Sequence, residues 1–443
     1  MTRSRGTILE YEDLGVHQAI ARFGILHTPT GGYDLPAMSP GIRTETDARA
    51  VLLTASGGLA IEAVTPLLSW GKSFGRTILD AFSGAGGEAQ VKPPLVVPDP
   101  EAEAFSFNCI ARGRFAGMAD TPPLVKRLMS CSLSGGDGRE EVYPHWKKYA
   151  AHYGFAALEE WLESRYEDVG SRTFFALGPI IRANATRVVQ CFNHVRTILE
   201  DEVAKALFPM HGAHFLMHSE MFSNTPESQA ALAKMYDQLE LLLDAPPVPD
   251  LFVSFKVWDA NGSLLDPQAG SARLRVLSEF TTEISERVRR FRGAVIGHNF
   301  ANLGLGILDS GADIASFRVS GPMRIDTPVR SVFRGPRPVP RLFNHGTLSE
   351  EPVEAVVAQW RSRRAFPVPA GVTPQPYWTK EGYTDQLLYA SHVRCAALVE
   401  LGREYRAAGL DKTIPLSEAL RSRILRSEVR QALLDLSPSL ANG

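Results

Sequence analysis

Polar side chains interrupt four apolar stretches of this sequence, mostly in their second halves. They are His218 and Glu220 in the stretch 214–221, Lys256 in 250–259, His298 and Asn299 in 293–300, and Asp313, Ser316 and Arg318 in 312–320. A strand with only a structural role would stay apolar, whereas parallel sheets carry their chemistry at the carboxyl ends of their strands. The pattern predicts a polar, substrate-binding pocket at one end of a sheet.

Histidines and a glutamate dominate the first of these stretches, which reads HGAHFLMHSE. In a strand, His214, His218 and Glu220 share one face because side chains alternate with a period of two. Neutral imidazoles with a carboxylate suit a divalent metal ion. The alternative is that His211 and His214 belong to a turn and His218 is a hydrogen-bonded core histidine.

Lysine in the stretch SFKVWD has two interpretations. Inside a barrel, the Lys256 amine can form a Schiff base with a carbonyl group or bind a phosphate. Equally, it can form an ion pair with a neighbouring carboxylate.

Arginines are concentrated in the segment RIDTPVRSVFRGPRPVPR, which follows the last of these stretches. Guanidinium groups bind phosphate well, so Arg324, Arg330, Arg334 and Arg337 are candidates for contacts with nucleic-acid phosphates. The alternative is a solvated loop whose arginines pair with acidic helices.

Strands and helices must alternate to position these residues. Expected strands are 51–56, 76–82, 214–221, 250–259, 293–300 and 312–320, and expected helices lie near 145–166, 185–206, 226–244, 271–291 and 300–310. This alternation indicates an α/β fold with a parallel sheet. Both a (β/α)8 TIM-like barrel and a doubly wound sheet fit. We expect a barrel with an N-terminal hairpin over 1–345, a proline-rich excursion or lid at 86–104, and a mainly helical extension over 346–443.

Composition narrows the class of protein. The chain has 443 residues, 44% of them hydrophobic, and a net charge of −2. It contains no apolar run of the roughly 20 residues that a membrane span needs, and no apolar segment typical of a secretory signal follows its basic start. The four cysteines are scattered without a CxxC pair, which favours a reducing compartment. We therefore expect a cytoplasmic protein with no membrane association.

Two glycine motifs overlap within residues 78–89. GAGGEA formally matches the dinucleotide-binding GxGxxG/A, and ILDAFSGAGG resembles the first motif of S-adenosylmethionine-dependent methyltransferases. Both need a helix directly after the glycines. The sequence continues as QVKPPLVVP, which excludes that helix, so we regard both matches as fortuitous and keep the methyltransferase only as an alternative.

Three segments resemble the tRNA-guanine transglycosylase (queuine/archaeosine tRNA-ribosyltransferase) superfamily. The opening stretch ARFGILHTPTGGYDLPAMSP follows its entry motif at Arg22, Gly24, Leu26, Thr28, Pro29, Gly31 or Gly32, Pro36 and Pro40. The segment 302–324 is similar to its late-barrel segment, and 386–409 to its C-terminal helix. Together they cover about 70 residues in the right order. The resemblance implies a (β/α)8 barrel, a pentosyltransferase activity and a purine or 7-deazapurine substrate in tRNA or DNA.

Catalytic positions of that family are altered here. Aligned on Gly311 and Asp313, its nucleophilic aspartate is Ser316. Its acid/base aspartate, from a D-S-G-G motif, is Ala55 in TASGG, which leaves Asp80 as the better-placed candidate. The resemblance thus implies a divergent site of Asp80, Asp313 and Ser316. The three zinc cysteines are missing, so we expect the family zinc to be lost, with His392 alone keeping a ligand position.

These observations favour a divergent base-exchange transglycosylase for guanine or 7-deazaguanine in nucleic acid. Membership of the DNA-modifying branch of the superfamily is compatible with them. Three alternatives remain. They are a catalytically inactive nucleic-acid-binding paralogue that serves as a partner subunit, an unrelated barrel enzyme that uses a His/Glu metal site or Lys256 on a phosphorylated small molecule, and the methyltransferase. A homodimer and a heterodimer with a homologue are both compatible with the sequence.

Overall fold

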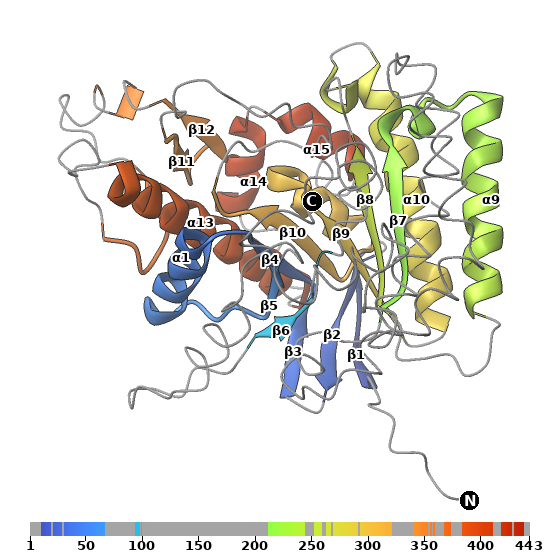
Figure 1. The fold of residues 1–443 in the computed structure, drawn as a ribbon, viewed down its shortest axis with the longest axis horizontal. Coiled ribbons are helices and arrows are strands. Elements are labelled where there is room, and N and C mark those ends of the chain that lie inside the picture. The colour runs from blue at the N-terminus through green and yellow to red at the C-terminus, as the bar shows by residue number, and fades with distance from the viewer. Residues whose placement is uncertain are drawn as a thin grey trace, which may run out of the picture.

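The fold is seen in a computed structural model (Figure 1). It describes residues 10–18, 21–28, 31–66, 94–97, 99, 211–243, 252–258, 263–266, 269–290, 293–320, 340–352, 355–356, 358, 367–373, 383–410, 418–427 and 429–437. Within these residues the protein is a mixed α/β structure. Its centre is a seven-stranded sheet in the order β6-β5-β4-β10-β9-β8-β7, and every neighbouring pair is parallel.

The parallel strands confirm four of the expected strands and add three that were missed. The confirmed strands are β7 (His211–His218), β8 (Phe252–Trp258), β9 (Ala294–His298) and β10 (Ile314–Arg318). The added strands are β4 (Ala37–Ile42), β5 (Ala63–Pro66) and β6 (Leu95–Val96). β6 lies within 86–104, so this proline-rich stretch contributes a strand to the sheet and is not simply an excursion or lid.

The expected strand at 51–56 is wrong, because these residues form the end of helix α1 (Glu45–Ser56). Thr44 caps the helix by accepting a hydrogen bond from the Asp47 amide at 3.2 Å. In return, Asp47 accepts hydrogen bonds from the amides of Arg43 and Thr44. This capping box satisfies the first amides of the helix. The helix therefore begins at Glu45, six residues before the stretch 51–56 that resembles a strand. The expected strand at 76–82 lies outside the described residues.

Helices connect and cover the sheet. Those near the expected positions are α9 (Pro226–Leu243), α10 (Gly270–Arg290) and α11 (Gly304–Asp309), with short 3-10 turns η4 (Ser219–Phe222), η5 (Ser263–Leu265) and η6 (Ala301–Leu303). The expected helices at 145–166 and 185–206 lie outside the described residues. Figure 1 shows α9 and α10 at the right, beside β7 and β8, and α1 at the left, near β4.

Three antiparallel strands lie below the parallel sheet in Figure 1: β1 (Glu10–Gln18), β2 (Ala21–Thr28) and β3 (Gly31–Leu35). β2 and β3 form the expected hairpin. Leu26, Tyr33 and Leu35 of this hairpin share a buried apolar cluster with the first residues of the parallel strands, among them Phe252 and Ile314. The N-terminal sheet therefore covers the amino ends of the parallel strands.

The opposite faces of the strands pack against helices. Val253, Phe255 and Val257 of β8 alternate with Phe252, Ser254 and Lys256, and only the odd-numbered set belongs to the large outer core. That alternation is the period of two that a strand imposes. It separates an outer apolar face from an inner face that changes from apolar at the amino end to polar at the carboxyl end.

The C-terminal residues belong to the same core as the sheet. They form the hairpin β11 (Leu342–Asn344) and β12 (Ser349–Glu351), the helix α13 (Tyr383–Leu410) and the short helices α14 (Glu418–Arg426) and α15 (Arg430–Leu436). Buried residues of α13 and α15, such as Leu398 and Leu436, join those of the sheet in one apolar cluster. The expected boundary at residue 345 falls in the β11–β12 turn. Among the described residues, no helix has the length and apolarity needed to span a membrane.

Candidate active site

An ion pair joins two strands that are far apart in the sheet. Lys256 Nζ on β8 donates to Asp99 Oδ2, three residues past β6, at 2.9 Å. Five strand-to-strand steps separate β6 from β8, which is about 24 Å along a flat sheet. The sheet must therefore curve strongly, so that its inner face encloses the pair. Both residues are about 1% exposed.

Asn299 connects this ion pair to the neighbouring strand. Its Nδ2 donates to Asp99 Oδ2 at 3.4 Å, and its backbone amide donates to Ser316 Oγ at 2.9 Å. The backbone of Asn299 is left-handed, with a φ of 62°, a conformation that costs free energy in any residue other than glycine. The two hydrogen bonds fix Asn299 in that conformation at the end of β9.

Other polar side chains lie on the same inner face. His298 is the register partner of Lys256, and Ser39 is the register partner of Ser316, so each pair shares a face of the sheet. The Ser39 and Thr65 hydroxyls form a hydrogen bond of 2.7 Å between β4 and β5. All of these residues are buried. The inner face therefore carries hydroxyl groups midway along the strands and ionisable groups near their carboxyl ends.

The structure brings together five of the predicted site residues: Lys256, His298, Asn299, Ser316 and Arg318, all on or directly after β8, β9 and β10. Arg318 ends β10 and is buried, and its carbonyl accepts a hydrogen bond from Arg394 of α13 at 3.4 Å. Lys256 pairs with a carboxylate, as one of its two interpretations predicted.

The Arg394 guanidinium on α13 is buried, and burial lowers its pKa to about 9.

Asp313 lies apart from this group. It directly precedes β10, at the amino end, and its Oδ2 accepts a hydrogen bond from the Val295 amide at 2.8 Å. Its own amide donates to the Val295 carbonyl at 2.8 Å. A carboxylate held this way joins the starts of β9 and β10, three residues below Ser316. The expectation that Asp313 approaches a sugar at the mouth of the sheet does not fit this placement.

Several predicted residues lie outside the described part of the chain. They are Asp80 and the arginines Arg324, Arg330, Arg334 and Arg337. For His218 and Glu220 only the backbone is described, at the end of β7 and in η4. Their roles remain predictions.

The residue that sequence reasoning missed is Asp99. It follows the apolar triplet Leu95-Val96-Val97 directly after Pro98, the same arrangement of a short strand and a polar residue that singled out the other site residues. The flanking prolines concealed this pattern, because they indicated an irregular loop. A strand of two residues with prolines on both sides is too short for its periodicity to be recognised.

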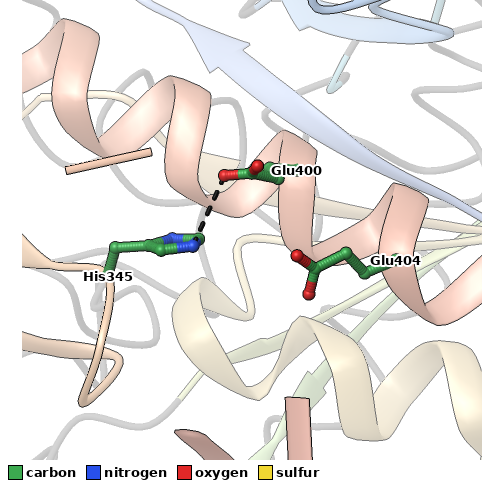
Figure 2. Close-up of side chains that lie close together, drawn as sticks. All are labelled: His345, Glu400 and Glu404. Carbon is green, nitrogen blue, oxygen red and sulfur yellow. Dashed lines mark ion pairs between the residues drawn. The ribbon is translucent and has the colours of Figure 1, made fainter. Parts of the chain in front are cut away.

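A second cluster of ionisable groups lies between the β11–β12 turn, α13 and α14. Figure 2 shows His345 of the turn facing Glu400 and Glu404, which are one turn apart on α13. His345 Nε2 lies 3.4 Å from Glu400 Oε2. These three residues are the only group of three metal-ligating side chains among the residues that the structure describes. His392, the predicted remnant of a zinc site, is not part of it, and burial lowers the pKa of that imidazole.

Arg423 of α14 is the cation of this second cluster. Its Nη1 lies 2.6 Å from His345 Nε2, and its Nη2 donates to Glu404. Burial and the Arg423 charge together lower the pKa of His345 to about 4, so the imidazole is neutral near pH 7 and accepts the hydrogen bond. Because an internal guanidinium already neutralises a carboxylate here, the arrangement fits a structural link between the turn and two helices better than a metal centre.

No protein-family model matches this chain, and no curated protein matches it. The assignment of a function therefore depends on the site itself and on the three resembling segments.

Proposed function

We propose that this protein is a divergent base-exchange transglycosylase that acts on guanine or a 7-deazaguanine in tRNA or DNA. The observation that carries the proposal is the Asp99 carboxylate, which Lys256 and Asn299 hold on the inner face of a curved parallel sheet, at the carboxyl ends of its strands. The three segments that resemble the tRNA-guanine transglycosylases support it independently.

Base exchange places particular demands on such a site. When the bond between C1′ of the sugar and the base nitrogen breaks, positive charge develops on C1′ and the ring oxygen, and the departing base needs a proton. The Asp99 carboxylate supplies negative charge in a buried environment, where electrostatic stabilisation is stronger than in water. Asn299, His298 and Arg318 provide an amide, an imidazole and a guanidinium for contacts with the base and sugar.

A closed (β/α)8 barrel is part of the same proposal. The first and last of the described parallel strands, β4 and β10, pair with each other, and the Asp99–Lys256 pair joins β6 to β8 across the inner face. Both features are expected of a barrel, in which active sites lie at the carboxyl ends of the strands. The arginines at 324–337 remain proposed contacts for nucleic-acid phosphates.

Exchange of radiolabelled guanine into tRNA or DNA tests this function. Asp99→Asn should abolish incorporation, whereas Asp313→Asn is a matched control that should retain it, because Asp313 lies at the amino end of β10. Incorporation that survives Asp99→Asn but not Asp313→Asn would reject the site. Binding of tRNA or DNA without exchange would favour the inactive partner subunit.

The small-molecule alternative loses part of its support. Lys256 would have to give up the Asp99 carboxylate to bind a phosphate group, and an anion would then approach that carboxylate. The methyltransferase alternative depends on residues 78–87, which lie outside the described part of the chain.

A further inference from the structure

Base exchange needs a group that captures C1′ after the first base leaves, and the residues around Asp99 offer two candidates. Ser316 is a poor one, since a neutral hydroxyl is a weak nucleophile and its Oγ already accepts a hydrogen bond from the Asn299 amide. The Lys256 amine is the stronger one. It lies on the inner face, 2.9 Å from a carboxylate.

Burial disfavours the charged form of this lysine, whereas the neighbouring Asp99 carboxylate favours it. In water a lysine is protonated and not nucleophilic at neutral pH, but a low-dielectric environment disfavours its charged form. The Asp99 oxygen within hydrogen-bonding distance can take the proton from Nζ, which converts an ion pair into a neutral amine and a neutral carboxyl group. Lys256 is thus both shielded from water and placed next to Asp99, which can accept its proton.

We propose that Lys256 is the covalent nucleophile of this site, which forms a bond between Nζ and C1′ of the nucleotide sugar. The inference rests on the proposed function. The bond between C1′ and the base breaks, and its electron pair leaves with the base, which takes up the proton that Asp99 had received from Nζ. Asp99 is then a carboxylate again. The lone pair of the neutral Lys256 amine forms the new bond to C1′, and Asp99 accepts the second proton, which Nζ loses when this bond forms.

The sugar–lysine adduct then has two outcomes. In exchange, a nitrogen of the incoming base attacks C1′, and Nζ leaves with its bonding electrons and takes the proton back from Asp99. The proton that the incoming base nitrogen loses passes to the Asp99 carboxylate. In the side equilibrium, the C1′–O4′ bond opens, O4′ takes a proton from Asp99, and Nζ and C1′ form an imine. That imine is the species that borohydride reduces to a stable secondary amine.

Two roles of Lys256 must be separated, because a cation could simply hold Asp99 in place. Lys256→Arg keeps the positive charge beside Asp99 but cannot form an imine. A positioning role predicts that Lys256→Arg retains much of the exchange activity, whereas a covalent role predicts its loss together with the loss of trapping. Lys256→Met removes both properties and is the second variant.

The experiment uses the full chain and a single-stranded DNA oligonucleotide with one abasic site, whose sugar exposes C1′ as an aldehyde. With borohydride, the wild-type protein should form a covalent adduct, and mass spectrometry of its peptides should place the reduced sugar on Lys256. Lys256→Arg should lose this adduct while its thermal unfolding stays close to that of the wild type. Peptide mapping is done on the wild-type protein, so the assignment of the adduct to Lys256 does not depend on whether Lys256→Met folds.

The proposal is overturned if the wild type gives no adduct, if the sugar maps to other lysines, or if Lys256→Arg is trapped equally well. Exchange measured in parallel separates the two proposals. Guanine exchange that persists in Lys256→Arg would reject the covalent role and leave the transglycosylase intact. Specific trapping on Lys256 without exchange in tRNA or DNA would reject the transglycosylase and retain a lysine that reacts with sugar carbonyls.

Discussion

The cluster around Asp99 and the cluster around Arg423 are built from the same kinds of groups in two different surroundings. Each holds a carboxylate against a cation, with a further nitrogen-bearing side chain beside them. The Lys256 and Asp99 side chains are 2% and 1% exposed, whereas those of Glu400 and Glu404 are 20% and 32% exposed. An ion pair that has lost its water costs more free energy to break than one that keeps some of it.

The two clusters also differ in what they connect. Lys256 and Asp99 are 157 residues apart, and their contact exists only because the sheet curves. Arg423 and Glu404 are 19 residues apart and join neighbouring helices. The interior pair therefore depends on the whole fold, whereas the C-terminal cluster joins elements that are neighbours in the chain. Four substitutions test this difference.

Lys256→Met should have the largest effect on stability. It leaves the Asp99 carboxylate buried without its cation, which typically costs about 3–5 kcal/mol. Urea unfolding measures the loss. The double variant Asp99→Asn/Lys256→Met should lose less than the two single variants added together, because the pair is removed as a unit. A loss below about 1 kcal/mol for Lys256→Met would show that the pair is solvated.

Ser316→Ala should have the next largest effect. It removes the acceptor of the Asn299 amide and leaves a buried N–H group without its partner, at a cost of about 1–3 kcal/mol. Asn299 should then leave its left-handed conformation, so exchange activity should fall together with stability. Ser316→Thr keeps the hydroxyl and is the matched control, and equal losses in both variants would indicate a packing effect.

Arg423→Met should destabilise the protein by a smaller amount, about 1–2 kcal/mol, because Glu404 can turn to water once its donor is gone. Thermal or urea unfolding provides the measurement. Exposed Arg426 on the same helix is the control, and Arg426→Met should be nearly neutral. If Arg423→Met and Lys256→Met lowered the free energy of unfolding equally, the greater exposure of the C-terminal cluster would not make its ion pair weaker.

The smallest effect should be the contribution of His345 to the pH dependence of stability. Its folded-state pKa, about 4, lies below its ordinary value of 6.5. The unfolded chain therefore binds more protons between those values, so this residue makes stability fall as the pH decreases from 6.5 towards 4. Between pH 7 and pH 5.5 the wild type should lose about 1 kcal/mol more than His345→Gln. Identical pH profiles would contradict the assignment of a neutral imidazole.

Local pattern explains why part of the fold could be predicted. β8, β9 and β10 are apolar runs of five to seven residues that end in polar groups, and α10 has the periodicity of a surface helix. β4 was missed because Pro40 and Gly41 interrupt its pattern, although both lie in the parallel ladder. The stretch 51–56 was misassigned because an apolar run inside a helix looks like a strand when the cap before it is overlooked.

Alternation and chain order are local properties, so they are enough to predict that Lys256, His298 and Asn299 lie near the carboxyl ends of neighbouring strands, with Ser316 midway along the next strand. The carboxylate that joins them depends on the tertiary structure. Asp313 is close to Ser316 in the sequence, but three residues along a strand carry it to the opposite end of the sheet. Asp99 is distant in the sequence, yet the curvature of the sheet brings it to 2.9 Å from Lys256. Curvature is a property of all the strands together, so no single segment could have revealed this partner.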